Sequence, residues 1–322
     1  MKRALHTTLA IALIGAATQV AAQGWPTKPV KLIVSQGAGG APDIVARLVS
    51  DRLSRTWGQQ VVVENRPGSG NVIGAQLAAR AAPDGYTLFF ATAAALVTNP
   101  YTFKTLPYDP AKDFVPIGIV GKAPFFVLVH PSVPAKTLGE LFALEKAQPG
   151  KLTYATDGPR NFSGMVAAWL NKLAGVNILQ IPYATMPQGV QDTVAGRTQL
   201  AILAIPAAAP QIKRGALRPL AFTAVRRAPG YEEVPPVSDT LPGFDFVGWF
   251  GIVAPTGTPR EVIQRANRDL DAVMRDPEIV QKLLGMGIFT DGADTPEGFG
   301  AFIRSELATW GKVVKEIGLQ PE

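Results

Sequence analysis

The stretch 30–57, VKLIVSQGAGGAPDIVARLVSDRLSRTW, constrains the fold more than any other part of the chain. Residues 31–35 form a short aliphatic run that ends at closely spaced glycines. After Pro42 and Asp43, apolar residues recur at helical spacing as far as Leu53. Proline suits the first turn of a helix, and an early aspartate complements the positive end of the helix dipole. The pattern predicts a strand, a glycine loop and the start of a helix.

The glycine loop has two interpretations that the sequence leaves open. The first backbone N–H groups of a helix have no helical acceptor, and they suit a carboxylate or a phosphate. In the other interpretation, Gly37, Gly39 and Gly40 only make the tight turn between strand and helix. The loop lacks the final glycine of the dinucleotide-binding fingerprint, so the sequence does not predict a dinucleotide cofactor.

The N-terminus predicts export from the cytoplasm. A short basic region precedes the mostly apolar run 9–17, and Val20-Ala21-Ala22 fits a small-residue cleavage site. This arrangement is typical of a secretory signal peptide, here residues 1–22, and it is too short for a membrane anchor. No later run has the apolar length of a membrane span. We expect the mature protein in a bacterial periplasm, with enough chain for two domains.

Composition argues against several classes of function. The chain has no cysteine, which excludes disulfides, thiolate metal sites and a lipid attached through cysteine. Basic residues are scattered, with no block denser than Arg226-Arg227, so we expect no nucleic-acid partner. His130 is the one histidine after the signal, and no G-x-S-x-G motif is present. We therefore expect that the protein is not an enzyme and holds no metal or cofactor. A hydrolase that depends on His130 ranks as a distant third hypothesis, behind the two binding functions given at the end of this subsection.

Strands and helices alternate in two series along the chain, the pattern of a mostly parallel sheet flanked by helices. The expected strands are 31–35, 60–64, 87–91, 115–120, 125–129, 152–156, 178–182, 200–203, 217–223 and 246–253. The two crossings between the series, near Gly121 and Phe246, predict a discontinuous first domain. It comprises residues 24–122 plus 246–322, and the second domain is 123–245. Paired crossovers of this kind permit hinge closure over a ligand.

Several helix starts carry local signals. Thr137 with Glu140 has the spacing of a capping box, and so has Thr258 with Glu261. A Thr-Pro-Glu sequence at 295–297 predicts the start of the last helix, and Asn71 is placed to cap an earlier one.

Together these segments resemble the periplasmic solute receptors of tripartite tricarboxylate transporters, the Bug (TctC-like) family. The motifs are KPVKLIV, VVVENRPGSGNVIGA, APDGYTL, LPYDPAKDF, PGKLTYAT, LAGV, IPY, APTGTP and WGKVVKEIG, spread over 28–318. The resemblance implies an α/β type II periplasmic binding protein fold, a two-domain "Venus flytrap" whose domains are joined by two crossover segments. It also implies capture of a carboxylate-bearing solute and its delivery to membrane permease subunits.

In that family, the loop after the first strand holds a ligand carboxylate through backbone groups and ordered waters. Its usual form resembles PFAPGGSTD, and here it is SQGAGGAPD at 35–43. The resemblance places Gly39, Gly40 and Asp43 in this role. Gln36 replaces an aromatic residue, and a proline replaces a hydroxyl residue with the loss of one donor N–H.

A second family loop, resembling YASSGNGTSSH, grips the ligand from the other domain, and here it is YATDGPRNFSG at 154–164. Thr156 and Ser163 keep hydroxyl groups, whereas Asp157, Arg160 and Phe162 depart from the family pattern. Arg160 either binds a second carboxylate with its guanidinium fork or pairs with Asp157 in a solvated loop. Phe162 either lines the cleft as a stacking surface or packs on the following helix.

A third departure concerns the residues after the strand 200–202. Many relatives resemble FDNLP there, but this chain has ILAIP. With the alanines 93–95 opposite, the cleft is predicted to be apolar and roomy, and it would leave an ammonium group unpaired at a high cost. The sequence therefore favours an aromatic or aliphatic mono- or dicarboxylate without an amino group. Tyr183 either contacts the ligand or belongs to the core.

The candidate ligand-binding residues share a position on the loops that face the predicted cleft. They are Gln36, Gly39, Gly40, Asp43, Thr92, Ala93, Thr156, Asp157, Arg160, Asn161, Phe162, Ser163, Tyr183, Ala204 and Ile205. The favoured function is a solute receptor of a tripartite tricarboxylate-type permease. The alternative is a periplasmic sensor that signals to a membrane sensor kinase, because both uses need the same flytrap.

Overall fold

The computed structural model describes residues 24–156, 158–183, 186–225 and 227–321. The predicted signal peptide and Asp157 lie outside these residues. Within them, no helix combines the length and the apolar character that crossing a membrane requires.

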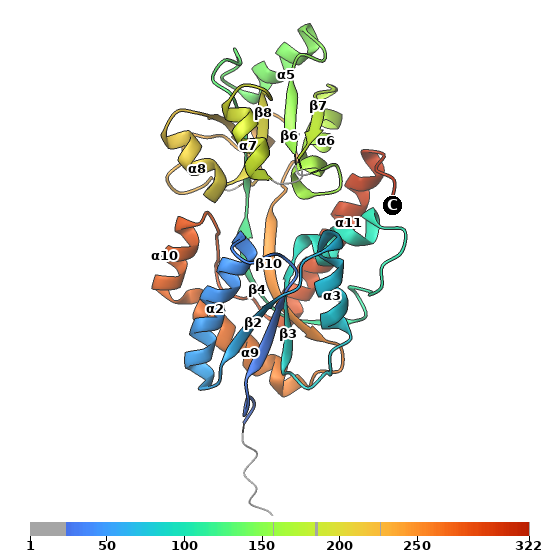
Figure 1. Cartoon of the computed structure of the whole chain (residues 1–322), viewed down its shortest axis with the longest axis vertical. Coiled ribbons are helices and arrows are strands. Elements are labelled where there is room, and N and C mark those ends of the chain that lie inside the picture. Colours follow the sequence, from blue (N-terminus) through green and yellow to red (C-terminus); the bar gives the residue numbers. More distant parts are fainter. Residues whose placement is uncertain (1–23, 157, 184–185, 226, 322) are drawn as a thin grey trace, which may run out of the picture.

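Two five-stranded sheets organise the described chain (Figure 1). The first has the order β2-β1-β3-β10-β4, and the second has the order β7-β6-β8-β5-β9. The strands of the first sheet are β1 (Val30–Val34), β2 (Val61–Asn65), β3 (Thr87–Thr92), β4 (Phe114–Ala123) and β10 (Gly248–Pro255). Those of the second are β5 (Phe125–Val129), β6 (Thr153–Thr156), β7 (Leu179–Pro182), β8 (Leu200–Ala204) and β9 (Arg218–Phe222). Each sheet mixes parallel and antiparallel pairs, and the predicted α/β class is confirmed.

Helices cover both sheets (Figure 1). Around the first sheet lie α2 (Ala41–Trp57), α3 (Val72–Ala79), α4 (Asn99–Thr102), α9 (Arg260–Arg275), α10 (Pro277–Gly285) and α11 (Pro296–Glu316). Around the second lie α5 (Leu138–Ala147), α6 (Phe162–Ala174), α7 (Met186–Val194) and α8 (Ile205–Lys213). Three further short helical segments are η1 (Ser69–Asn71), η2 (Ala94–Thr98) and η3 (Val237–Asp239).

The strand and helix that the sequence predicts at 30–57 form as β1 and α2. Successive strand residues point to opposite faces of a sheet, and Leu32 accordingly packs under α2 while Ile33 enters the core on the other face. The helix contributes Val45, Val49 and Leu53, all buried at helical spacing. Ile44, which the predicted apolar stripe included, is instead 47% exposed.

The chain passes between the sheets at two places. Pro124 separates β4 in the first sheet from β5 in the second, and the segment between Phe222 and Gly248 leads back to the first sheet. There β10 pairs antiparallel with β4, from Gly248 opposite Ala123 onward. The crossings lie where the sequence predicts them, and the exact domain boundaries stay a prediction.

Two of the four predicted helix caps form as predicted. Thr137 Oγ1 accepts the Glu140 N–H at 3.1 Å, and Thr295 Oγ1 accepts the Gly298 N–H at 3.0 Å. The capping box at Thr258 is wrong, because its hydroxyl donates to the carbonyl of Pro255 at 2.7 Å. Asn71 is the residue before α3, as predicted, but its side chain makes no cap hydrogen bond, since its backbone is left-handed and its side chain turns toward β1.

Candidate ligand-binding site

We call the first sheet with its helices the first unit, and the second sheet with its helices the second unit. A pocket of about 680 Å³ lies between residues of these two units, and its volume is within the range of sites for small molecules. The first unit contributes Ser35, Gln36, Gly37, Ala41, Pro42, Pro67, Gly68, Ser69, Gly70, Asn71, Thr92, Ala93, Ala94, Ala123, Gly248, Trp249, Phe250, Met286 and Ile288. The second contributes Phe125, Asn161, Phe162, Met186, Ala204 and Pro206.

Polar side chains of the pocket gather where β1 and β3 end and where α3 is about to begin. The carboxyl ends of parallel strands meet at one edge of a sheet, so Ser35 after β1 and Thr92 at the end of β3 lie on the same side. Asn71 joins them from the loop before α3. Its Oδ1 accepts the Ser35 hydroxyl at 3.2 Å and also the Gln36 side-chain amide. These groups form a polar wall made of Ser35, Gln36, Ser69, Asn71 and Thr92.

Asp43 holds the glycine loop from inside. This residue is 3% exposed, and its carboxylate accepts the Gly39 N–H at 2.8 Å, Arg47 Nε–H at 3.0 Å and Asn65 Nδ2–H at 2.9 Å. The hydrogen bond from Arg47, together with those from Gly39 and Asn65, lowers the pKa of Asp43 to about 2 against the opposing effect of burial. Asn65 also donates to the carbonyl of Gln36 at 3.0 Å, so this network reaches the polar wall.

The backbone N–H groups of Gly39 and Gly40, the two glycines that match the family pattern, have acceptors within the loop. Gly39 donates to Asp43, and the Gly40 N–H lies 3.4 Å from the carbonyl of Gly37. None of Gly39, Gly40 and Asp43 lines the pocket. The geometry therefore favours the interpretation in which these residues shape the turn. The loop reaches the pocket through Gln36, Gly37, Ala41 and Pro42 instead.

The second unit contributes an aromatic surface. Phe162, the first residue of α6, stacks on Phe125 with ring centroids 4.4 Å apart and an interplanar angle of 27°. Both rings are half-buried and line the pocket. Phe162 also meets Trp310 of α11 edge-on at 5.7 Å. The structure thus places Phe162 in the cleft and against a neighbouring helix at once, so the two interpretations of this residue are compatible.

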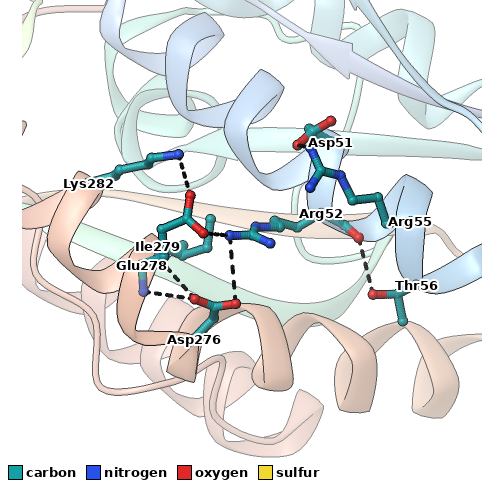
Figure 2. Close-up of polar contacts among 8 residues, drawn as sticks. All are labelled: Asp51, Arg52, Arg55, Thr56, Asp276, Glu278, Ile279 and Lys282. Atoms are coloured by element: carbon teal, nitrogen blue, oxygen red, sulfur yellow. Dashed lines mark hydrogen bonds and ion pairs between the residues drawn. The ribbon is translucent and has the colours of Figure 1, made fainter.

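An ion-pair network links α2 to α10 (Figure 2). Arg52 of α2 pairs with Glu278 and lies 3.9 Å from Asp276 Oδ2, which places α2 against the start of α10. Asp276 caps α10 by accepting the Glu278 N–H at 2.8 Å. Ala41 at the start of α2 and Met286 after α10 both line the pocket, at the ends of these helices that lie away from the network.

Six of the predicted site residues line the pocket, and most of the others are placed elsewhere. The six are Gln36, Thr92, Ala93, Asn161, Phe162 and Ala204. Thr156, Ser163 and Ile205 are buried outside the lining. Tyr183 donates its hydroxyl to Asp192 at 2.8 Å, which fits a role in the fold.

Arg160 lies outside the lining, and its guanidinium donates to the carbonyl of Gln320 at 3.1 Å. This contact links the loop before α6 to the segment that follows α11. The role of Arg160 as a clamp on a second ligand carboxylate stays a prediction.

Sequence reasoning missed several lining residues. Ser69 and Asn71 lie in the segment RPGSGN at 66–71, where the sequence predicts only a helix cap at Asn71, although the polar residues there are a usable signal. Phe125, Trp249 and Met286 come from distant parts of the chain and carry no local signal that separates them from core residues.

The pocket lining has no charged side chain among its described residues. Hydroxyl, amide and backbone groups are therefore the donors available to an anion. His130 lies at the opposite end of β5 from Phe125, with its Nδ1 2.7 Å from the Ser132 hydroxyl. In the part of the chain that the structure describes, no group of three or more His, Cys, Asp or Glu side chains could hold a metal ion. The arrangement suits binding of a small molecule.

The profile of the tripartite tricarboxylate transporter family receptor, TctC, matches residues 45–319. The chain belongs to this family. Among curated relatives, the protein BugT of Bordetella pertussis is 32% identical over 310 residues, covering 96% of this chain and 95% of BugT. A UPF0065 protein of Bordetella bronchiseptica is 34% identical over 300 residues, or 93% of this chain and 89% of the relative.

Solved structures of TctC-type proteins share the fold. An R. palustris protein solved with adipate is 31% identical, has a TM-score of 0.83 and covers 92% of this chain and 100% of its own. MatC from Rhodopseudomonas palustris, solved with bound malate, is 27% identical with a TM-score of 0.78, and the match covers 90% of this chain and 100% of MatC. The periplasmic binding protein BugD is 29% identical with a TM-score of 0.80, and the match covers 92% of this chain and 100% of BugD. The family consists of receptors rather than enzymes, and the chain has the predicted periplasmic binding protein fold.

Proposed function

We propose that this TctC-family receptor captures a small organic carboxylate in the pocket between its sheets and delivers it to permease subunits of a tripartite tricarboxylate-type transporter. The observation that carries the proposal is the pocket itself, whose walls come from both sheet units. A ligand held by both walls stabilises a closed arrangement over an open one, because it contacts both units only when they approach.

The donors of the pocket suit a carboxylate. The polar wall offers hydroxyl and amide groups, and α2 begins at its edge with Ala41. The first N–H groups of a long helix are directed at the space before it, where an anion is favoured by the helix dipole. Adipate and malate, the ligands of two solved relatives, are both carboxylates, which supports the same chemical class here.

The hinge belongs to the proposal as well. In this proposal, residues 24–122 and 246–322 form one domain and residues 123–245 form the other. The two hinges are the connection from β4 to β5 and the segment that leads into β10. Residues 1–22 serve as a cleaved export signal, and the mature receptor works in the periplasm. Sequencing the N-terminus of the exported protein tests that cleavage.

The binding test is calorimetry on the mature protein with a panel of carboxylates, each paired with its neutral carboxamide. We expect at least one acid to bind and its amide to lose most of the affinity, with a raised melting temperature for the bound form. Small-angle scattering with and without that acid should show a smaller radius of gyration when it binds. Equal binding of acid and amide would contradict the carboxylate site, and an unchanged radius would contradict closure.

A pair of variants places the ligand in the pocket. Gln36→Ala removes a donor of the polar wall, and the affinity for the acid should fall. Gln264→Ala on the exposed face of α9 is the control, and it should leave the affinity unchanged. If both variants bind the acid as the wild type does, the polar wall is not the carboxylate site.

A further inference from the structure

The walls of the pocket differ in character, and the difference bears on the ligand. Hydroxyl and amide side chains are concentrated on the polar wall of the first unit, as defined above. The remaining side chains that face the ligand space and retain exposure are mainly apolar, including Phe125, Phe162, Met186 and Met286. Asn161 is the polar side chain that the described lining has on the second unit. A ligand that matches both walls has one polar end and one apolar body.

No cation in the described lining is available for a second carboxylate. Arg47 donates to Asp43 of the glycine loop and to Asn65 at the end of β2, and Arg160 donates to the carbonyl of Gln320. Lys122 lies outside this lining, with its ammonium 4.9 Å from the ring centroid of Phe302. A second carboxylate held against the apolar walls would lose its water without gaining an opposite charge, which is strongly unfavourable.

The apolar body of the ligand faces a prepared aromatic surface. Phe125 and Phe162 are stacked with ring centroids 4.4 Å apart and an interplanar angle of 27°, and a ligand ring placed beside them gains aromatic contacts beyond the burial of its area. Met186 and Met286 contribute flexible thioethers, which pack favourably against aromatic edges. A saturated ring would gain the same burial without the aromatic contacts.

We infer that the solute is a monocarboxylate with an aromatic body, its carboxylate on the polar wall and its ring beside the Phe125–Phe162 stack. This inference rests on the proposed function and narrows it. It excludes dicarboxylates as preferred solutes, although solved relatives contain adipate and malate. The pocket volume of about 680 Å³ accommodates a substituted benzoate with its ordered waters.

The test uses matched ligands in calorimetry at one ionic strength. They are para-toluate, terephthalate, the saturated-ring analogue of para-toluate, adipate and para-toluamide. We expect terephthalate and adipate to bind about 100-fold more weakly than para-toluate, because one carboxylate loses its water without a cation. The saturated-ring analogue should bind about tenfold more weakly, through the loss of aromatic stacking.

The outcomes separate the inference from the function on which it rests. Terephthalate or adipate binding as tightly as para-toluate would overturn the inference and leave the carboxylate receptor intact. A saturated ring that binds equally well would overturn its aromatic part. If para-toluamide matches para-toluate, or no acid binds, the proposed function fails together with the inference.

A variant tests the aromatic surface directly. Phe162→Leu keeps an apolar side chain at the start of α6 but removes the ring from the stack. It should weaken para-toluate about tenfold and change the saturated-ring analogue little, so the preference for the aromatic ring disappears. Leu173→Ala, at an exposed position of the same helix, should leave both affinities unchanged. Equal losses for both acids in Phe162→Leu would show a purely structural role and refute the stacking.

Discussion

Replacing Asp43 tests how the loop after β1 is held. Its buried carboxylate accepts hydrogen bonds from Gly39, Arg47 and Asn65, which lower its pKa to about 2 from the ordinary 3.8. Each pKa unit corresponds to about 1.4 kcal/mol of preference for one protonation state. The ionised carboxylate therefore stabilises the fold by about 2 kcal/mol near neutral pH, relative to the protonated group.

Asp43→Asn imitates the protonated carboxyl group and should lower the free energy of unfolding by about 2 kcal/mol near neutral pH. Because the folded state depresses this pKa, the contribution is complete above the unfolded pKa and is lost as the pH falls through the folded one. The difference between wild type and variant should shrink to about 1 kcal/mol near pH 3 and to about 0.4 kcal/mol near pH 2.

Urea unfolding, followed by tryptophan fluorescence at a series of pH values, measures this difference. Asp51→Asn is the matched control on the same helix, since Asp51 pairs with Arg55 at 2.8 Å but its side chain is 58% exposed (Figure 2). It should change stability little at any pH, as exposed ion pairs do. The reasoning is refuted if the two variants lose equal stability, or if the loss in Asp43→Asn is the same in acid and at neutral pH.

Two further substitutions, each with a control variant, test how the helices support the pocket. A Cβ on Gly74 would lie 2.8 Å from Ser35 Cα and 2.9 Å from the carbonyl oxygen of Arg66. Gly74→Ala should therefore lower the free energy of unfolding by about 1–3 kcal/mol, and it should weaken ligand binding because it displaces Ser35. In Gly285→Ala the added atom meets nothing within 4 Å, so this variant should match or exceed wild-type stability in the same unfolding assay. A Gly74→Ala protein more stable than Gly285→Ala would contradict the packing argument. Arg52→Ala removes the link between α2 and α10 and should lower the melting temperature by about 1–2 °C at low salt. The exposed Arg55→Ala should change it less, and a deficit in Arg52→Ala that persists at high salt would argue against an ionic origin.

Local patterns in the sequence were sufficient for the elements and for the family. Many strands carry their own apolar period and their own glycine or proline boundary, so β1, β2 and β3 lie within a residue of their predicted ranges. The two crossings also follow from the order of the elements. Caps were less predictable, because a threonine such as Thr258 can satisfy its hydroxyl with a nearby carbonyl as readily as it caps a helix.

The site depended on contacts that no local pattern contains. Asp43 has the family position in the glycine loop, but only the folded loop brings Gly39 and Asn65 to its carboxylate and withdraws it from the pocket. The loop before α6 suggested a ligand role for Arg160, but its guanidinium reaches the carbonyl of Gln320.

The order of strands and helices and the receptor family follow from the sequence alone. The tertiary structure decided which side chains face the ligand. Phe125, Trp249 and Met286 meet in one pocket although long stretches of chain separate them. The physical reason is that periodicity sets which face of an element is apolar, whereas the direction of a loop side chain depends on the partners that the rest of the fold brings within hydrogen-bonding or stacking distance.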